Sequence, residues 1–186
     1  MILQKDILAW RAVAPWPRLE QVEHDLVLSR ALCEMYTLPT VANSLIFRGG
    51  TALHKLFCTP AGRFSEDLDF AQKKAEPIGN SINAIRERLD PWLGIPSWKQ
   101  GQGRFTLKYL FHTETTPIVS RKLKIEINTR EHFNVLPFSE KHFRVQNPWF
   151  SGESAISTKE RKRSIRLLVC HATKEKCRYP YRLTTF

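Results

Sequence analysis

Long apolar runs are absent from this 186-residue sequence, and none approaches the length that spans a bilayer. Charges at Lys5, Asp6 and Arg11 interrupt the N-terminal segment, which therefore lacks the apolar core of a signal peptide. Internal repeats and low-complexity linkers are also missing. These absences argue against a membrane or secreted protein, and we expect a cytoplasmic chain without a membrane partner.

Cysteine is scarce, and its spacing fits neither a redox motif nor a metal site. The four residues form no C-x-x-C pair and no metal-ligand pattern. They are Cys33, Cys58, Cys170 and Cys177. We expect buried or idle thiols in a reducing compartment.

Apolar residues make up 42% of the chain and include five Trp, which is typical of a globular protein with one solid core. The hydrophobic pattern alternates between helical and strand periods. It predicts a helix over 18–36, a loop leading to a strand over 44–47, a helix from 51, a strand over 63–71, a helix over 78–93 broken near Pro91, and strands over 103–114 and 117–131. This order predicts an α+β domain with a mixed sheet flanked by helices.

Two carboxylates stand out in the predicted strand "RFSEDLDFA". Leu68 and Phe70 share one face of this strand, while Asp67 and Asp69 share the other. Like charges so close together repel each other unless a cation lies between them, and hard divalent cations prefer oxygen ligands. The D-x-D pair therefore predicts a Mg²⁺ or Mn²⁺ site.

A third carboxylate lies in "KLKIEIN", where Leu123, Ile125 and Ile127 form the apolar face of a later strand. Glu126 is on its polar face, two residues after Lys124. A two-metal site needs such a further carboxylate, and a lysine beside it would neutralise phosphate charge.

The stretch "FRGGTALHKLF" supplies a phosphate-binding element. Gly49 and Gly50 end an apolar strand, and Thr51 is expected to cap the following helix. Free backbone N–H groups at a helix N-terminus bind phosphate, and glycine permits close approach. Arg63 and Ser65 would add a charged clamp and a hydroxyl. Together these residues predict a site for a nucleoside triphosphate and metal ions.

Each feature also has an ordinary interpretation. A Gly-Gly pair is usually a turn, a D-x-D pair is more often a solvated face, and Glu126 or Arg63 alone would be a surface charge. The order of the elements favours the functional interpretation, because a strand, Gly-Gly-Thr, a helix, the D-L-D strand and a carboxylate-bearing strand follow one another.

The motif "FRGGTALHKLF…RFSEDLDF" resembles the AbiEii/AbiGii toxin family, which includes the MenT-like toxins of the polymerase-β-like nucleotidyltransferase superfamily. Gly49, Gly50, Asp67 and Asp69 fall on the first motif of that superfamily. "KLKIEIN" resembles the second family motif and aligns Lys124 and Glu126 with its lysine and acidic residue. The resemblance covers roughly residues 20–158.

The resemblance implies a metal-dependent nucleotidyltransferase of a toxin–antitoxin system, which transfers NMP from an NTP to an RNA, with a tRNA 3′ end as acceptor. Asp67, Asp69 and Glu126 would hold the metal, and Lys124 would neutralise developing charge. A cognate antitoxin is an expected partner. Two alternatives stay open: a metal-dependent nuclease that uses the same acids, and a truncated, weak or inactive remnant that binds nucleotide or an antitoxin.

The last 28 residues depart from the family pattern. From Lys159 onward nine Lys or Arg face two Glu, a balance of +7, which leaves +4 of the net +11 for residues 1–158. The family's C-terminal helices, which contribute catalytic and substrate-binding groups, have no counterpart in this segment. We therefore expect a nucleotidyltransferase-like domain over 1–158 and an atypical basic tail over 159–186. The tail is either out-of-frame peptide or a basic arm for RNA.

Overall fold

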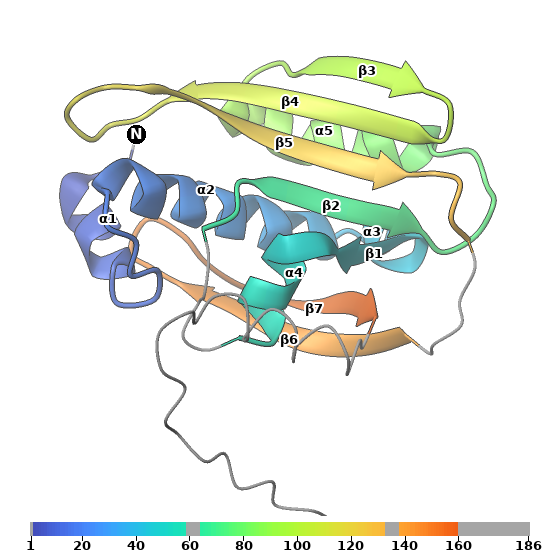
Figure 1. Cartoon of the computed structure of the whole chain (residues 1–186), viewed down its shortest axis with the longest axis horizontal. Coiled ribbons are helices and arrows are strands. Elements are labelled where there is room, and N and C mark those ends of the chain that lie inside the picture. The colour runs from blue at the N-terminus through green and yellow to red at the C-terminus, as the bar shows by residue number, and fades with distance from the viewer. Residues whose placement is uncertain (1, 59–63, 133–137, 160–186) are drawn as a thin grey trace, which may run out of the picture.

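Seven strands form one mixed β-sheet in the order β3-β4-β5-β2-β1-β7-β6 (Figure 1). The computed structural model of the chain describes residues 2–58, 64–132 and 138–159. The strands are β1 (Leu45–Arg48), β2 (Asp67–Gln72), β3 (Ser97–Gly101), β4 (Arg104–His112), β5 (Ser120–Asn128), β6 (Phe138–Gln146) and β7 (Ser151–Lys159). The pairs β2–β5 and β1–β7 are parallel, and the other four neighbouring pairs are antiparallel. The predicted α+β class with a mixed sheet is confirmed.

The helices lie on both sides of this sheet. They are α1 (Gln4–Trp10), α2 (Leu19–Tyr36), α3 (Pro39–Ser44), α4 (Gly49–Leu56) and α5 (Gly79–Leu93). In Figure 1, α2, α3 and α5 lie behind the strands, and α4 lies in front of them. Helix α4 contacts β1 and β2, the central strands. Among the described elements, α4 alone covers the front face, and none of them covers β3, β4 and β5 on that side.

The core lies between the sheet and the α2–α5 layer. Leu68 and Phe70 of β2 point into it, together with Leu123, Ile125 and Ile127 of β5, and all five are almost fully buried. The predicted apolar face of each strand is thus confirmed. Because successive side chains of a strand alternate between faces, the charged residues of β2 and β5 lie on the opposite, α4-bearing face.

Several predicted boundaries were wrong. The loop expected before β1 contains the short helix α3, whose first turn accommodates Pro39. Helix α5 does not break near Pro91 but continues to Leu93, because a proline in the last turn removes only one backbone hydrogen bond. It ends at Gly94, which adopts φ +81°. The D-L-D strand begins at Asp67 rather than at residue 63.

Five described elements were not predicted: α1, α3, β3, β6 and β7. Strand β7 pairs with β1 through Phe47 and Thr158, and the Thr158 hydroxyl donates a 2.9 Å hydrogen bond to the Phe47 carbonyl. The β6–β7 hairpin thereby extends the sheet on the side away from β5. The predicted tail lies outside the described residues beyond Lys159, so its nature stays a prediction.

The predictions about membrane helices and cysteines can be compared with the described residues. No helix among them combines the length and apolarity that crossing a membrane requires. Cys33 is buried and Cys58 is half-buried, and neither forms a disulfide. Cys170 and Cys177 lie outside the described residues.

Candidate nucleotide and metal site

The parallel pairing of β2 with β5 brings the predicted carboxylates together. Asp67 lies opposite Lys124, and Asp69 lies opposite Glu126. Adjacent strands in a sheet are about 4.8 Å apart, so four charged side chains gather within two residue rows on one face. The three acids and the lysine predicted from separate motifs therefore form one cluster.

Lys124 lies between two of the acids. Its Nζ is 3.1 Å from Asp67 Oδ2 and 3.1 Å from Glu126 Oε2. Burial works to lower the pKa of Lys124, but the hydrogen bonds to Asp67 and Glu126 outweigh it and hold that pKa above its usual value. Lys124 is therefore a stable positive charge at the centre of the cluster.

Asp69 is an acid of the cluster whose charged form is disfavoured. Burial raises the pKa of its carboxyl above the ordinary value, and repulsion from Asp67 and Glu126 raises it further. Lys124 and Arg48 oppose this shift only in part. A second cation close to Asp69 would relieve the repulsion, which is the electrostatic condition expected of a metal ligand.

The structure gives Gly49 a contact with Asp69, whereas the sequence predicted a contact with phosphate. It begins α4 with φ +84°, and a Cβ at this position would lie 2.4 Å from Asp69 Oδ2. The space left by the missing side chain thus holds the Asp69 carboxylate, whereas we expected it to admit a phosphate. The absence of a side chain at Gly49 therefore lets the Asp69 carboxylate pack against the start of α4.

We expect Gly49→Ala to lower the free energy of unfolding by at least about 1–2 kcal/mol, because a side chain there is strained by the backbone and collides with Asp69. Urea denaturation measures this change. The matched control is Gly79→Ala at the start of α5, where an added Cβ meets nothing within 4 Å. Equal effects of the two substitutions would contradict the close fit of Gly49 and Asp69.

The N-terminus of α4 faces the same cluster. Its N-cap is Arg48, which makes no side-chain capping bond, so Thr51 is not the cap that we predicted. The fully buried Thr51 hydroxyl donates to the Asp67 carbonyl at 2.6 Å and lies 2.7 Å from the Ser65 hydroxyl. Thr51 therefore fastens α4 to β2, and among the described residues no side chain accepts a hydrogen bond from the first N–H groups of the helix. Arg63, the predicted clamp, lies outside the described residues.

A recess of about 470 Å³ opens between this helix end and the carboxylates. Its lining comes from the start of α4, the segment before β2 and β2 itself, and consists of Gly50, Phe64, Ser65, Glu66, Asp67 and Asp69. Backbone N–H groups and carboxylates thus face one space from two sides. A polyphosphate can meet the helix N-terminus there, while cations bridge it to the acids.

The donor chemistry of the cluster fits a hard divalent cation. Asp67, Asp69 and Glu126 offer carboxylate oxygens, which Mg²⁺ and Mn²⁺ prefer. Within the described residues no three acidic, His or Cys side chains converge closely enough to hold an ion as placed. Two of the three acids are instead paired with a lysine, since the Lys124 ammonium forms ion pairs with Asp67 and Glu126. Metal ligation by these two acids requires the lysine to move toward another anion.

Two residues that the sequence analysis missed extend the cluster. Arg104 at the start of β4 places Nε 3.1 Å from Glu126 Oε1. Arg121 on β5 bonds Glu66 Oε1 at 3.1 Å, beside the recess. Neither arginine belongs to a recognisable motif. Both contacts join segments that are distant in the chain, so the sequence pattern did not indicate them.

A buried ion pair, also unpredicted, holds α4 against α2. Lys55 Nζ is 2.6 Å from Asp25 Oδ1 and 2.8 Å from the Ser29 hydroxyl. The indole N–H groups of Trp10 and Trp16 donate to the same Asp25 carboxylate at 2.8 and 3.1 Å. The sequence carried a signal for it, since Asp25 interrupts the apolar stripe of its helix and Lys55 lies one turn after Thr51.

Comparison with known proteins agrees with this geometry. Residues 30–166 match the family described as the nucleotidyl transferase AbiEii toxin of type IV toxin–antitoxin systems. Among solved structures, the chain is similar to MenT4, a nucleotidyltransferase toxin from Mycobacterium tuberculosis H37Rv, with 20% identity and a TM-score of 0.59. JHP933 from Helicobacter pylori is 19% identical, with a TM-score of 0.47. No curated protein sequence matches the chain.

The structural matches cover most of this chain but only part of each relative. They span 83% of this chain in both cases, against 54% of MenT4 and 58% of JHP933. The likeness to MenT4 therefore establishes the fold of the described domain. The family match includes both strands of the charged cluster and helix α4.

Proposed function

The chain belongs to the AbiEii family of nucleotidyltransferase toxins, and on this premise we propose that it transfers NMP from an NTP to the 3′ end of an RNA, most specifically a tRNA. The observation that carries the proposal is the β2–β5 register, which places Asp67, Asp69, Lys124 and Glu126 beside the uncapped start of α4. Acids, a cation and free N–H groups around one recess are what a metal-bound triphosphate requires.

Each part of the site has a role in this reaction. Asp67, Asp69 and Glu126 would hold Mg²⁺ or Mn²⁺, which supplies charge neutralisation at the phosphates when bound. The N–H group at Gly50, which lines the recess, would donate to phosphate oxygens, and the Ser65 hydroxyl faces the same recess. Arg63 stays a predicted clamp.

Lys124 supplies the positive charge that does not depend on a metal. A lysine is protonated at neutral pH even without the contacts that raise its pKa here, so Lys124 would keep its charge on leaving Asp67 and Glu126 and could follow charge that develops on the transferred phosphoryl group. The acceptor hydroxyl attacks the α-phosphorus in line, and pyrophosphate departs. Positioning by the helix terminus and charge neutralisation account for most of the rate.

The open front face of β3, β4 and β5 favours a polyanionic acceptor. Lys99 lies opposite Thr106, which lies opposite Glu126, so these side chains share the face of the carboxylates. Lys108 and Lys122 lie on the same face, and all three lysines are exposed. We call these three residues the basic stripe. It begins beside the acids and follows the part of the sheet that α4 leaves uncovered, as an RNA backbone requires.

Transfer is tested by incubating the purified chain with each α-labelled NTP, Mg²⁺ and tRNA, and by sizing the RNA. Extension by one or more nucleotides supports the proposal. Shortened RNA would instead identify a nuclease, and unchanged RNA with retained NTP binding would identify an inactive remnant. The cognate antitoxin would be expected to suppress the extension. Because NTP and tRNA are the proposed substrates, the proposed site of the reaction is the cytoplasm.

For the basic stripe, we expect Lys99→Glu, Lys108→Glu and Lys122→Glu together to raise the KM for RNA strongly while leaving the KM for NTP unchanged. The dependence of log KM on log salt should fall by about 2, because each phosphate contact on single strands contributes about 0.7. The control triple, Lys5→Glu, Arg11→Glu and Arg88→Glu, removes the same charge from exposed positions away from this face. Equal loss of RNA affinity in both triples would mean that net charge alone acts.

A further inference from the structure

The sheet has two outer strands, β3 at one end and β6 at the other. Among the described residues each of them pairs with one neighbour, β3 with β4 and β6 with β7. The outer N–H and C=O groups of such a strand are a template for pairing with another chain. The two strands differ in length and in charge, and this difference decides which of them suits a partner strand.

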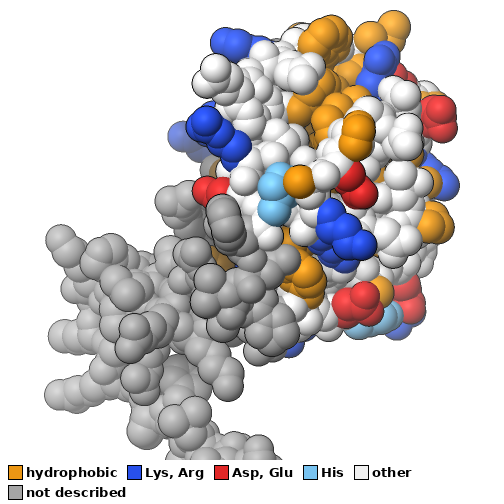
Figure 2. Space-filling model, turned by 90° about the vertical axis from the view of Figure 1, so that its right-hand side faces the viewer, with side chains coloured by type: hydrophobic (Ala, Val, Ile, Leu, Met, Phe, Trp, Pro, Cys, Tyr) orange, Lys and Arg blue, Asp and Glu red, His pale blue; other side chains and the backbone are white. Residues whose placement is uncertain are grey.

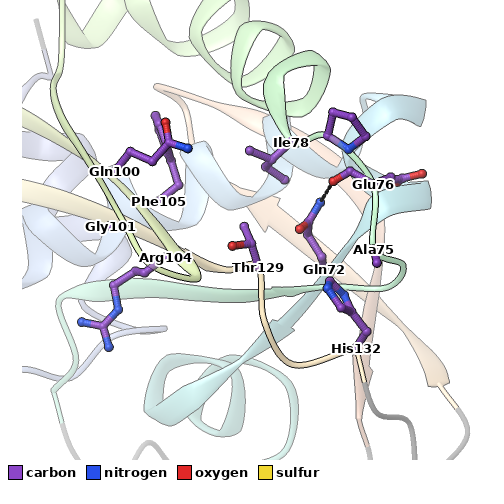
Figure 3. A pocket seen from close by; sticks show the side chains of 11 residues that line it. Gln72, Ala75, Glu76, Ile78, Gln100, Gly101, Arg104, Phe105, Thr129 and His132 are labelled. Atoms are coloured by element: carbon purple, nitrogen blue, oxygen red, sulfur yellow. Dashed lines mark hydrogen bonds between the residues drawn. The ribbon is translucent and has the colours of Figure 1, made fainter.

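Strand β3 is poorly suited to pairing with a further strand. It has five residues, and its central residue is the exposed Lys99. Its last two residues line a cavity of about 380 Å³, and Figure 3 shows Gln100 and Arg104 extending to opposite sides of the β3–β4 turn beside that cavity. A short edge strand with a lysine is a common means of preventing edge-to-edge association.

Strand β6 is a longer and more regular edge. Its nine residues all pair with β7 in an unbroken register. Phe143 and Val145 lie on the core side and are almost fully buried. In Figure 1, β6 forms the lower edge of the sheet, and the lower rim of the molecule in Figure 2 carries charged side chains of both signs. The exposed face of the strand consists of Glu140, His142, Arg144 and Gln146.

The charges on this exposed face are self-complementary. When two copies of β6 pair antiparallel about a two-fold axis through His142, Glu140 of each copy lies opposite Arg144 of the other. The same register pairs Phe138 with Gln146, so all nine residues of both strands have a partner. Opposite charges that face each other across a strand pair contribute favourably, and the symmetry makes this charge pair occur twice.

The other symmetric registers lose this complementarity. An axis that passes through a residue keeps the core-facing side chains of both copies on one side of the joined sheet. An axis through Glu140, Lys141 or Arg144 places like charges opposite each other. An axis through Phe143 removes both Glu140–Arg144 pairs. The charges of β6 therefore specify the axis at His142.

Contacts inside one copy are compatible with this pairing. Arg144 Nε is 3.1 Å from Glu153 Oε1 on β7, and the Arg144 side chain is 55% exposed. A guanidinium carries five N–H donors, so Arg144 can bond Glu153 on one side and Glu140 of the second copy on the other. On the core side, Lys141 lies opposite Phe143 of the second copy, which brings no like charges together.

We propose that β6 is the interface of a homodimer, in which two copies of this chain pair their β6 strands antiparallel about a two-fold axis at His142 and form one continuous sheet. The inference does not rest on the proposed nucleotide transfer. Both front faces then point to the same side. Three strand intervals within each copy and one across the interface, seven in all, separate the two β2 strands by at most about 34 Å. Since β6 contributes no residue to the recess or to the basic stripe, both stay outside the interface.

Reciprocal charge reversal tests the pairing on the full chain. Sedimentation velocity at about 100 μM protein is expected to show a dimer. Glu140→Arg and Arg144→Glu should each weaken the dimer Kd at least about tenfold, because each places like charges opposite each other twice. An equimolar mixture of the two variants should dimerise again, since the arginines of one chain then face the glutamates of the other. A misfolded variant would not show this rescue. The control Glu87→Arg reverses an exposed charge on α5 and should leave the Kd unchanged.

A cysteine at the axis tests the register. His142→Cys places two cysteines across the axis with Cα atoms about 4.5–5.5 Å apart, a separation that a disulfide spans. Mild oxidation should then give a disulfide-linked dimer on a non-reducing gel. Gln146→Cys on the same face is the control, because its two copies would lie about 27 Å apart.

Three results would each overturn the proposed dimer. They are an unsubstituted chain that sediments as a monomer, a mixture of the two charge variants that stays monomeric, and equal cross-linking of the two cysteine variants. Because none of these measurements involves NTP or RNA, a failure of the transfer reaction leaves their outcome unchanged.

Discussion

Asp69→Asn is expected to abolish nucleotide transfer and, at the same time, to stabilise the metal-free protein. Loss of a metal ligand removes several kcal/mol of charge stabilisation from the transition state, so the rate should fall by about three orders of magnitude or more. The gain in stability follows from the raised pKa of Asp69, whose charge is disfavoured by burial and by Asp67 and Glu126. An amide of the same shape carries no such charge.

The gain in stability should depend on pH in a defined direction. A carboxyl whose pKa is raised in the folded state is most favourable when protonated, so its cost appears as pH rises through the folded pKa. The advantage of Asp69→Asn is therefore full at neutral pH and shrinks as pH falls toward the ordinary Asp value of 3.8. Urea denaturation at several pH values measures it, together with RNA extension at pH 7.

Two matched variants separate this effect from general loss of charge. Glu87→Gln removes an exposed carboxylate of α5 and should change neither activity nor stability. Asp67→Asn should abolish transfer without the same gain in stability, because it also takes a partner from Lys124. Metal-dependent transfer by Asp69→Asn at the original rate would remove Asp69 from the metal site.

Lys55→Met should lower the free energy of unfolding by about 3–5 kcal/mol, because it leaves the Asp25 carboxylate buried without a counter-charge. Lys55 is 7% exposed and Asp25 is 1% exposed. Burial works to raise the pKa of Asp25, but Lys55 together with the indole donors of Trp10 and Trp16 outweighs burial and keeps this pKa below its usual value. Since Lys55 belongs to α4, the loss also loosens the helix that presents N–H groups to the nucleotide.

The double variant Lys55→Met with Asp25→Asn distinguishes a lost charge pair from a packing defect. Removing both charges should restore most of the stability, because the pair's own net contribution is small once desolvation is counted. Arg86→Met breaks the more exposed pair with Asp90 on α5 and should cost less than about 1 kcal/mol. If the double variant is as unstable as Lys55→Met alone, the unpaired carboxylate is not the cause.

The sequence by itself determined which face of each central strand carries the charged residues of the candidate site. Alternation in "DLDF" and "KLKIEI" separates charged from apolar residues, and this period follows from the backbone geometry of any strand. The Gly-Gly-Thr segment likewise predicted a strand-to-helix junction. The β6 and β7 segments escaped prediction, because "FSEKHFRVQ" and "SGESAISTK" are polar strands whose pairing partners decide their structure.

Only the tertiary structure decided how the charged residues of β2 and β5 are placed next to each other. A parallel register between β2 and β5 puts Asp69 opposite Glu126, and slippage by one residue would have sent every acid of one strand to the other face. The same register inserts Lys124 between two acids and lets Arg104 reach Glu126. Such contacts join segments distant in the chain, and no local pattern encodes them. The close fit of Asp69 on Gly49 has the same origin, because a glycine's missing Cβ has meaning only once its neighbour is known.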